Sequence, residues 1–242
     1  MVKKDASIID IFWGAGFGVI ALVCLKLAGV KTPYILLLTA LPTIWAIRLS
    51  VYLGIRNLPH GEDFRYAEMR RNVDPKKWAW WSLSRIYIGQ GLAMLLVAAP
   101  LYVGMATGRT LEIGPLAILG TLIWLIGFLF EAIGDWQLSR FVKSMKSYTG
   151  TYEDKPVLDT GLWKYTRHPN YFGIAVMWWG IWLVACQAPL GWITIISPIA
   201  MTYFLMKVTG AKHLELTLNK RPAYRDYVKR TSEFFPRPPK KT

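Results

Sequence analysis

Residues 161–173 read GLWKYTRHPNYFG and lead directly into an apolar stretch that continues to residue 185. This segment lies at the mouth of an apolar run, yet it carries Arg167, His168 and Asn170. Polar side chains are costly in such a place and commonly serve a ligand or an ion. Gly161 and Pro169 both interrupt helices, which predicts a short connector before the apolar helix. We therefore interpret the segment as half of a ligand site.

Further apolar runs lie on both sides of this segment and decide the fold class. The chain has 242 residues, of which 53% are hydrophobic. Many of them gather into runs near or above the roughly 20 residues needed to cross a bilayer. We place six spans, at about residues 8–27, 34–54, 84–106, 115–135, 171–185 and 192–206. The sequence therefore predicts an all-α, polytopic integral membrane helix bundle that forms one domain over residues 1–242.

Basic residues follow the positive-inside rule. The segments before the first span and after the second, fourth and sixth carry 25 Lys and Arg residues, whereas the opposite side has Lys26, Lys31 and Arg109. This distribution predicts that both termini lie in the cytoplasm. It also accounts for most of the formal net charge of +14, so that no nucleic-acid partner is needed to explain the charge.

The cysteines and the first apolar run point away from other kinds of site. Cys24 and Cys186 lie inside apolar runs without metal-site or disulfide spacing, so we expect small buried hydrophobic residues and no metal. No small-residue cleavage site follows the first run, and we expect no cleavable signal peptide.

Small and polar residues open the first span. Gly14, Gly16 and Gly18 alternate as in a phosphate-binding loop, but no strand precedes them and no lysine follows. Close helix packing is the better interpretation. Asp10 either caps this helix at the membrane boundary or contributes to a polar cavity.

The second loop and the third span hold further polar candidates. Most of the charged residues after the second span fit a solvated loop, but Gly61 allows an unusual backbone turn that would direct Glu62 toward the bundle. In the third span, Tyr87 and Gln90 are three residues apart and share a helix face, beside Gly91. A hydrogen bond to a neighbouring helix and a contact to substrate are both open for this pair.

The fourth span ends in charged residues. Glu131 and Asp135 share a face, and Arg140 and Lys143 follow within two turns. These groups either pair with one another or hold the hydroxyl and phosphate groups of a nucleotide. The basic, tyrosine-containing tail after the sixth span either adheres to anionic lipid or closes over a cytoplasmic ligand.

Five motifs together resemble the bacterial branch of the steroid 5-alpha-reductase family over nearly the whole chain. They are RHPNYFG at 167–173, GED at 61–63, the opening DIFWG at 10–14, Gln90-Gly91 and the terminal RTSEFFP at 230–236. A shorter Arg-His-Pro-x-Tyr-x-Gly form is shared with other sterol reductases and with isoprenylcysteine-type membrane methyltransferases. The chain departs from the family at Ile174, where its members usually have Glu, and many members carry a further helix ahead of Asp10, which would give seven spans.

The resemblance implies reduction, with NADPH as cofactor, of a carbon–carbon double bond conjugated to a ketone. The typical substrate is a 3-oxo-4-ene steroid, entering from the membrane lipid. The resemblance makes Tyr87 the hydrogen-bond donor to the ketone and Glu62 its partner, and Gln90 is our candidate substrate contact. It also implies a bacterial inner-membrane protein whose cytoplasmic loops cap the cofactor site, while its oligomeric state is left open.

The candidate cofactor residues fall into two groups. The resemblance supplies Asp135, Arg167, His168, Asn170 and Tyr171. Looser matching and charge add Arg140, Lys143, Lys155, His213, Tyr224 and Tyr227. The alternatives are an S-adenosylmethionine-dependent membrane methyltransferase built on the shared core, and a non-catalytic lipid-binding or scaffold protein.

Overall fold

The computed structural model is helical throughout the part of the chain that it describes, residues 5–208, 215 and 218–240. Within these residues there is no strand, and the one isolated bridge pairs Thr166 with Ser232. The prediction of an all-α fold is confirmed. The α-helices are α1 (Ile8–Ala28), α2 (Pro33–Asn57), α3 (Phe64–Arg71), α4 (Trp78–Ser82), α5 (Gly89–Val97), α6 (Ala99–Thr107), α7 (Pro115–Ser144), α8 (Pro169–Ala185), α9 (Ile196–Tyr203) and α11 (Pro222–Arg230).

Several of these helices are long and apolar enough to cross a membrane. Three qualify alone, namely Ile8–Ala28, Pro33–His60 and Pro115–Ser147, and the pair Trp78–Val97 and Ala99–Thr107 qualifies as one span bent by 41°. The chain is therefore a membrane protein with three or four such spans among the described residues, fewer than the six we predicted. Helix α8 has only 17 residues, and the last predicted span is divided into a 3-10 turn, α9 and a π turn.

The chain divides into two compact units. Unit 1 comprises Met1–Ile118 and Ile181–Ser197, and unit 2 comprises Leu119–Gly180 and Pro198–Thr242. Each unit is described by itself, and the single domain expected from the sequence remains a prediction.

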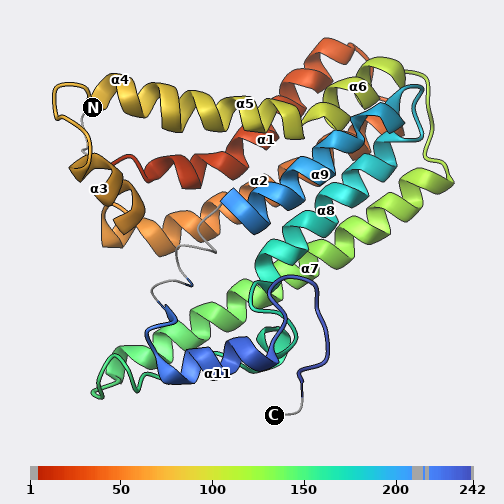
Figure 1. Cartoon of the computed structure of the whole chain (residues 1–242). Helices are drawn as coiled ribbons and strands as arrows, with labels where there is room; N and C mark the ends of the chain where they lie inside the picture. The colour runs from red at the N-terminus through yellow and green to blue at the C-terminus, as the bar shows by residue number, and fades with distance from the viewer. Residues whose placement is uncertain (1–4, 209–214, 216–217, 241–242) are drawn as a thin grey trace. The chain divides into compact units, whose positions relative to one another are not determined.

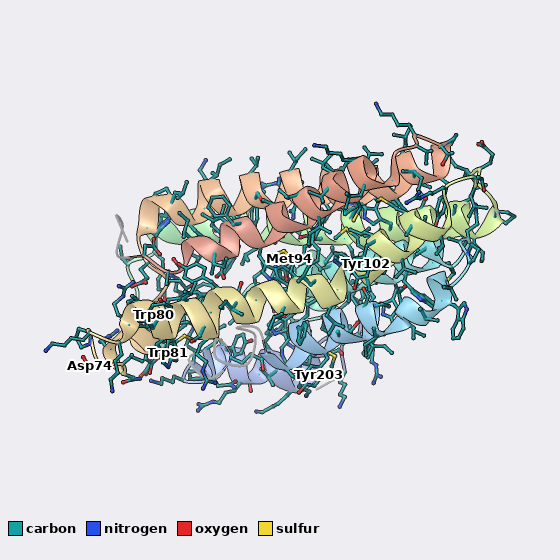
Figure 2. All side chains as sticks on the ribbon, turned by 90° about the horizontal axis from the view of Figure 1, so that it is seen from above. Asp74, Trp80, Trp81, Met94, Tyr102 and Tyr203 are labelled. Atoms are coloured by element: carbon teal, nitrogen blue, oxygen red, sulfur yellow. The ribbon has the colours of Figure 1, made fainter. Side chains whose placement is uncertain are left out.

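In unit 1, α1 packs along α2 through its glycines (Figure 1). A Cβ atom placed on Gly14 would lie 3.1 Å from Leu49, and one on Gly18 would lie 3.1 Å from Ala46. Gly16 instead faces the sulfur of Met94 on α5, which Figure 2 labels. The predicted packing role of these three glycines is confirmed.

Helices α4 and α5 continue one another through the π turn Leu83–Ile88. Trp80 and Trp81 lie on α4, close to the turn that contains Asp74 (Figure 2). The bend before α6 falls where Pro100 occupies the first turn of the next helix, because proline lacks the N–H that would continue the hydrogen bonding of α5.

In unit 2, α7 and α8 approach so closely that glycine is required on both. A Cβ atom on Gly173 would lie 2.6 Å from the Gly127 carbonyl oxygen, and one on Gly180 would lie 2.5 Å from that of Gly120. The glycines are seven residues apart on each helix, so they line one face. This contact positions the start of α8, where the polar motif lies.

The connector before α8 is held against α7. Gln137 accepts a hydrogen bond from the Leu162 N–H at 3.0 Å, and the Trp163 indole donates to the Gly134 carbonyl at 3.0 Å. Gly161 has φ +60°, a conformation that glycine adopts without strain. The short connector that we predicted before the apolar helix is confirmed.

Candidate functional site

Glu62 of unit 1 is held by three hydrogen bonds, all of which it accepts. Arg70 donates from Nη2 to Oε1 at 2.6 Å and from Nε to Oε2 at 3.2 Å, and the Ala6 backbone N–H donates at 2.7 Å. The preceding Gly61 has φ +72°, the unusual turn expected there. Glu62 is 13% exposed. Its ion pair with Arg70 ties the loop after α2 to α3, and its hydrogen bond from Ala6 ties that loop to the chain just before α1.

A second polar network lies beside this ion pair. The Tyr66 hydroxyl on α3 donates to Asp10 Oδ1 at 2.6 Å and accepts from Gln90 Nε2 at 3.2 Å. Arg65 donates to the other Asp10 oxygen at 2.9 Å and also to Asp63 at 2.9 Å. Asp10 does not cap α1, whose N-cap is Ser7; it joins this hydrogen-bonded network, and its contribution to a polar cavity stays a prediction. Of the two roles open for Gln90, the structure shows the hydrogen bond to a neighbouring segment.

The charges around α3 fix the protonation of its neighbours. Burial acts to raise the pKa of Asp63, but the hydrogen bonds and charge of Arg65 outweigh it, and the pKa is lowered. The pKa of Tyr66 is raised, first by burial and then by the negative charge of Asp10. Tyr66 therefore stays a neutral phenol whose proton is committed to Asp10.

Tyr87 lies against the same polar region but keeps its hydroxyl unengaged. Its ring packs on the buried cluster that contains Ala6 and Tyr66. Within the described residues its hydroxyl makes no hydrogen bond, neither to Glu62 nor to another group. Tyr87 is half-buried, so this phenol retains a free proton to donate.

In unit 2, the motif before α8 contains a buried charge cluster. Arg167 donates to the Glu215 carboxylate from Nε at 2.8 Å and from Nη2 at 3.2 Å, and from Nη1 to the Thr231 carbonyl at 3.0 Å. His168 Nε2 lies 3.2 Å from the same carboxylate. The side chains of Arg167 and His168 are 8% and 9% exposed, and both contact the Glu215 carboxylate.

Burial and charge act against each other in this cluster. Burial alone would raise the pKa of Glu215, yet hydrogen bonds from His168 and Arg167 lower it to about 2. The pKa of Tyr224 is raised by burial and by the Glu215 charge, so its phenol is neutral. Arg167 and Glu215 therefore carry opposite charges in direct contact within this cluster.

The first turn of α8 arranges the remaining motif residues. Asn170 donates from Nδ2 to Asp135 on α7 at 3.1 Å and accepts from the Tyr171 N–H at 3.0 Å. The Tyr171 ring stacks on His168, with ring centroids 5.5 Å apart. Ile174, where the resemblance expects Glu, is 7% exposed and belongs to the apolar core.

The C-terminal segment after α11 pairs with the motif. The Arg167 N–H donates to the Ser232 carbonyl at 2.9 Å, and the Thr166 hydroxyl donates to the Phe234 carbonyl at 2.8 Å. Phe234 also meets Phe172 edge to face. The two sequence motifs at 167–173 and 230–236 are therefore neighbours, although about 60 residues separate them.

The structure brings together some candidate cofactor residues and separates others. Asp135, Arg167, His168, Asn170 and Tyr171 form one connected group, and Tyr227 donates to the Trp163 carbonyl at 2.5 Å beside it. Lys155 contributes its backbone carbonyl to Arg221. Arg140 and Lys143 are exposed on α7. His213 lies outside the described residues.

Sequence reasoning assigned no role to four residues that organise these groups. Arg65, Tyr66 and Arg70 belong to the short helix α3, whose mixture of charges fitted a solvated loop. Glu215 lies 48 residues from Arg167 in sequence. Among the described residues, no group of three or more His, Cys, Asp or Glu is placed to hold a metal ion.

Comparison with known proteins supports a family but names no activity. A family model described as "Protein of unknown function (DUF1295)" matches residues 1–231. The chain belongs to this family. An uncharacterized protein of the fission yeast Schizosaccharomyces pombe is 24% identical over 220 residues, which cover 84% of this chain and 63% of the yeast protein. The chain thus spans just under two thirds of that relative's length. No solved structure matches this chain.

Proposed function

We propose that this DUF1295 protein is a membrane-embedded, NADPH-dependent reductase of a carbon–carbon double bond conjugated to a ketone, with a 3-oxo-4-ene steroid or a similar lipophilic enone as substrate. The observation that carries the proposal is the unengaged Tyr87 hydroxyl beside the network of Glu62, Arg70, Tyr66 and Asp10. The sequence motifs shared with steroid 5-alpha-reductases support the same activity.

The proposed chemistry needs a hydrogen-bond donor at the ketone. NADPH, when bound, would supply the hydride that adds to the β-carbon of the enone. Negative charge then develops on the carbonyl oxygen, and a proton from solvent or from the same donors adds to the α-carbon to complete the reduction. The Tyr87 hydroxyl donates to that oxygen, which contributes about 3 kcal/mol of transition-state stabilisation. Tyr66 is not available for this step because its proton is committed to Asp10.

In this proposal Glu62 does not contact the ketone itself. Its oxygens accept from Arg70 and from the Ala6 N–H, which are contacts of an ionised carboxylate. Glu62 therefore fixes the loop and supplies negative charge near Tyr87. Gln90, whose amide is oriented by Tyr66, is the proposed polar contact to the substrate.

The polar residues of unit 2 fit a nucleotide cofactor in part. Asn170 and Tyr171 are half-buried and present an amide and an aromatic ring that suit a base or nicotinamide. Arg167 and His168 are committed to Glu215, so their proposed role is to shape the motif rather than to bind phosphate. The positive-inside rule predicts that this group lies on the cytoplasmic side, where NADPH is found, and this prediction supports the proposal.

The test measures turnover of a panel of enone steroids by the protein in lipid nanodiscs. Turnover is monitored as the loss of NADPH absorbance, and the reduced product is identified. Tyr87→Phe is expected to lower kcat at least a hundredfold while NADPH binding survives. Tyr102→Phe, at an exposed tyrosine of α6, is the matched control and should retain wild-type activity. Equal activity of wild type and Tyr87→Phe would remove Tyr87 from the reaction.

One observation favours a second candidate, an S-adenosylmethionine-dependent methyltransferase. The charge cluster is built around Arg167, His168 and Tyr171, and these are the motif residues shared with membrane methyltransferases of the isoprenylcysteine type. In addition, the buried Ile174 stands where the reductase pattern has a carboxyl group. Binding of S-adenosylmethionine without binding of NADPH to the purified protein would establish this alternative.

A further inference from the structure

Helix α7 carries a continuous apolar stripe that no part of the described chain covers. Its members recur every three or four residues and so lie on one face of the helix. They are between 42% and 55% exposed: Leu122 53%, Leu125 45%, Leu129 49%, Ile133 42% and Trp136 55%. Because α7 is one of the spans able to cross a membrane, this face is the one that lipid covers.

The length of the stripe locates the membrane boundary on α7. Leu116, 40% exposed, lies near the start of the helix, and Trp136 is twenty residues further on. At about 1.5 Å per residue this distance is about 30 Å, the thickness of the hydrocarbon core. Trp136 therefore lies at the level of the headgroups, where tryptophan is enriched.

Two cations continue the same stripe beyond this boundary. Arg140 is one turn past Trp136, and its guanidinium lies 5.0 Å from the centre of the Trp136 ring. Lys143 follows two turns past Trp136 and is exposed. Neither cation has an ion-pair partner among the described residues. Both are therefore available to an anion at headgroup depth.

The face of α7 that serves the motif lies on another side of the helix. Asp135 is 2% exposed and bonds to Asn170, and Gly134 packs on Pro169. At 100° per residue, Asp135 is turned around the helix axis by about 140° from Arg140 and by about 80° from Lys143. Neither cation therefore shares the face of α7 that holds Asp135.

We propose that Trp136, Arg140 and Lys143 form a binding site for the phosphate group of an anionic phospholipid in the leaflet at this end of α7. The indole and the apolar stripe contact the lipid chain and backbone, while the two cations hold the phosphate. The site is independent of the proposed reductase activity, and it gives these two cations a lipid role in place of the cofactor role first considered for them.

The test compares binding of phosphatidylglycerol and of phosphatidylcholine to the detergent-purified full chain by native mass spectrometry. The wild type is expected to retain phosphatidylglycerol selectively. The double variant Arg140→Gln, Lys143→Gln should bind it roughly thirtyfold more weakly, since each cation near anionic lipid contributes roughly a fivefold effect. The single variant Arg140→Lys should keep most of the affinity, because a lysine there retains the charge.

A second double variant, Arg225→Gln with Lys229→Gln, removes the same charge from exposed positions of α11. Selectivity unchanged in the α7 variant, or lost equally in both, would overturn the site. NADPH affinity is measured in the same variants. A loss of NADPH binding with lipid selectivity intact would return Arg140 and Lys143 to the cofactor, whereas a wild type that never binds NADPH would refute the reductase alone.

Discussion

The Arg70 guanidinium donates hydrogen bonds to both oxygens of the Glu62 carboxylate, at 2.6 Å and 3.2 Å. The same guanidinium lies 4.7 Å from the centre of the Trp78 ring, so it is stacked as well as hydrogen-bonded. Arg70 thereby connects the loop after α2 with the start of α4. The ion pair is largely shielded, because the side chains are 24% and 13% exposed.

Removing Arg70 should destabilise unit 1. Arg70→Met leaves the Glu62 carboxylate with only the Ala6 N–H, and we expect a loss of about 2 kcal/mol, less than for a fully buried pair. Arg71→Met is the control, since the Arg71 side chain is exposed. Thermal unfolding in detergent measures both. Equal unfolding temperatures of the two variants would show that the ion pair contributes nothing measurable.

The two tyrosines of unit 1 should separate stability from activity. Tyr66→Phe deletes a buried hydroxyl bonded to Asp10 and Gln90, so we expect a loss of about 1–3 kcal/mol. Tyr87→Phe deletes a hydroxyl with no hydrogen bond among the described residues and should unfold at the wild-type temperature. Unfolding temperature and enone turnover are measured on both proteins. A destabilised Tyr87→Phe would reveal a structural role for that hydroxyl.

Acid should weaken unit 2 through Glu215. Its pKa is lowered from the ordinary 4.5 to about 2, so the charged cluster stabilises the fold fully above pH 4.5 and progressively less as the pH falls toward 2. For a half-buried carboxyl we discount the effect to about 2 kcal/mol. In Glu215→Gln the unfolding temperature should change less with pH across this range than in the wild type. Glu153→Gln, at an exposed site, should leave the pH dependence of the unfolding temperature unchanged.

Replacing a glycine in the contact between α7 and α8 by alanine should destabilise the protein. In Gly173→Ala the new Cβ would lie 2.5 Å from the Glu131 backbone nitrogen, and helix backbone cannot yield as a side chain does. We expect a loss of about 1–3 kcal/mol. Gly91→Ala places its methyl group in open space and should be neutral or slightly stabilising, as the unfolding temperatures of the two variants will show.

Hydropathy predicted the helices well where a helix is apolar throughout. The prediction of 8–27 differs by one residue at its end from α1 (Ile8–Ala28), because apolar residues and helix end together. It was poorer for α7, which continues to Ser144 although its apolar part ends near residue 135. The last predicted span failed as a continuous helix because composition does not show where 3-10 and π turns replace α-helical hydrogen bonds.

The candidate site was predictable where its residues are close in sequence. The motif from Arg167 to Tyr171 is one local turn, and the backbone conformation of Gly61 followed from its residue type. The partners that satisfy these charges come from elsewhere in the chain. Arg70 lies eight residues from Glu62, and Glu215 lies 48 from Arg167. An isolated sequence does not show which of many charges meet after folding, so the partner of each motif residue emerged only from the structure.

The pairing of residues 165–168 with residues 231–237 also has a consequence for truncation. The Thr166 hydroxyl donates to the Phe234 carbonyl, and the Arg167 N–H donates to the Ser232 carbonyl. A chain cut before residue 231 has neither acceptor. Its connector would keep the contacts of Leu162 and Trp163 to α7 but would lose the partners that Thr166 and Arg167 have in the C-terminal segment.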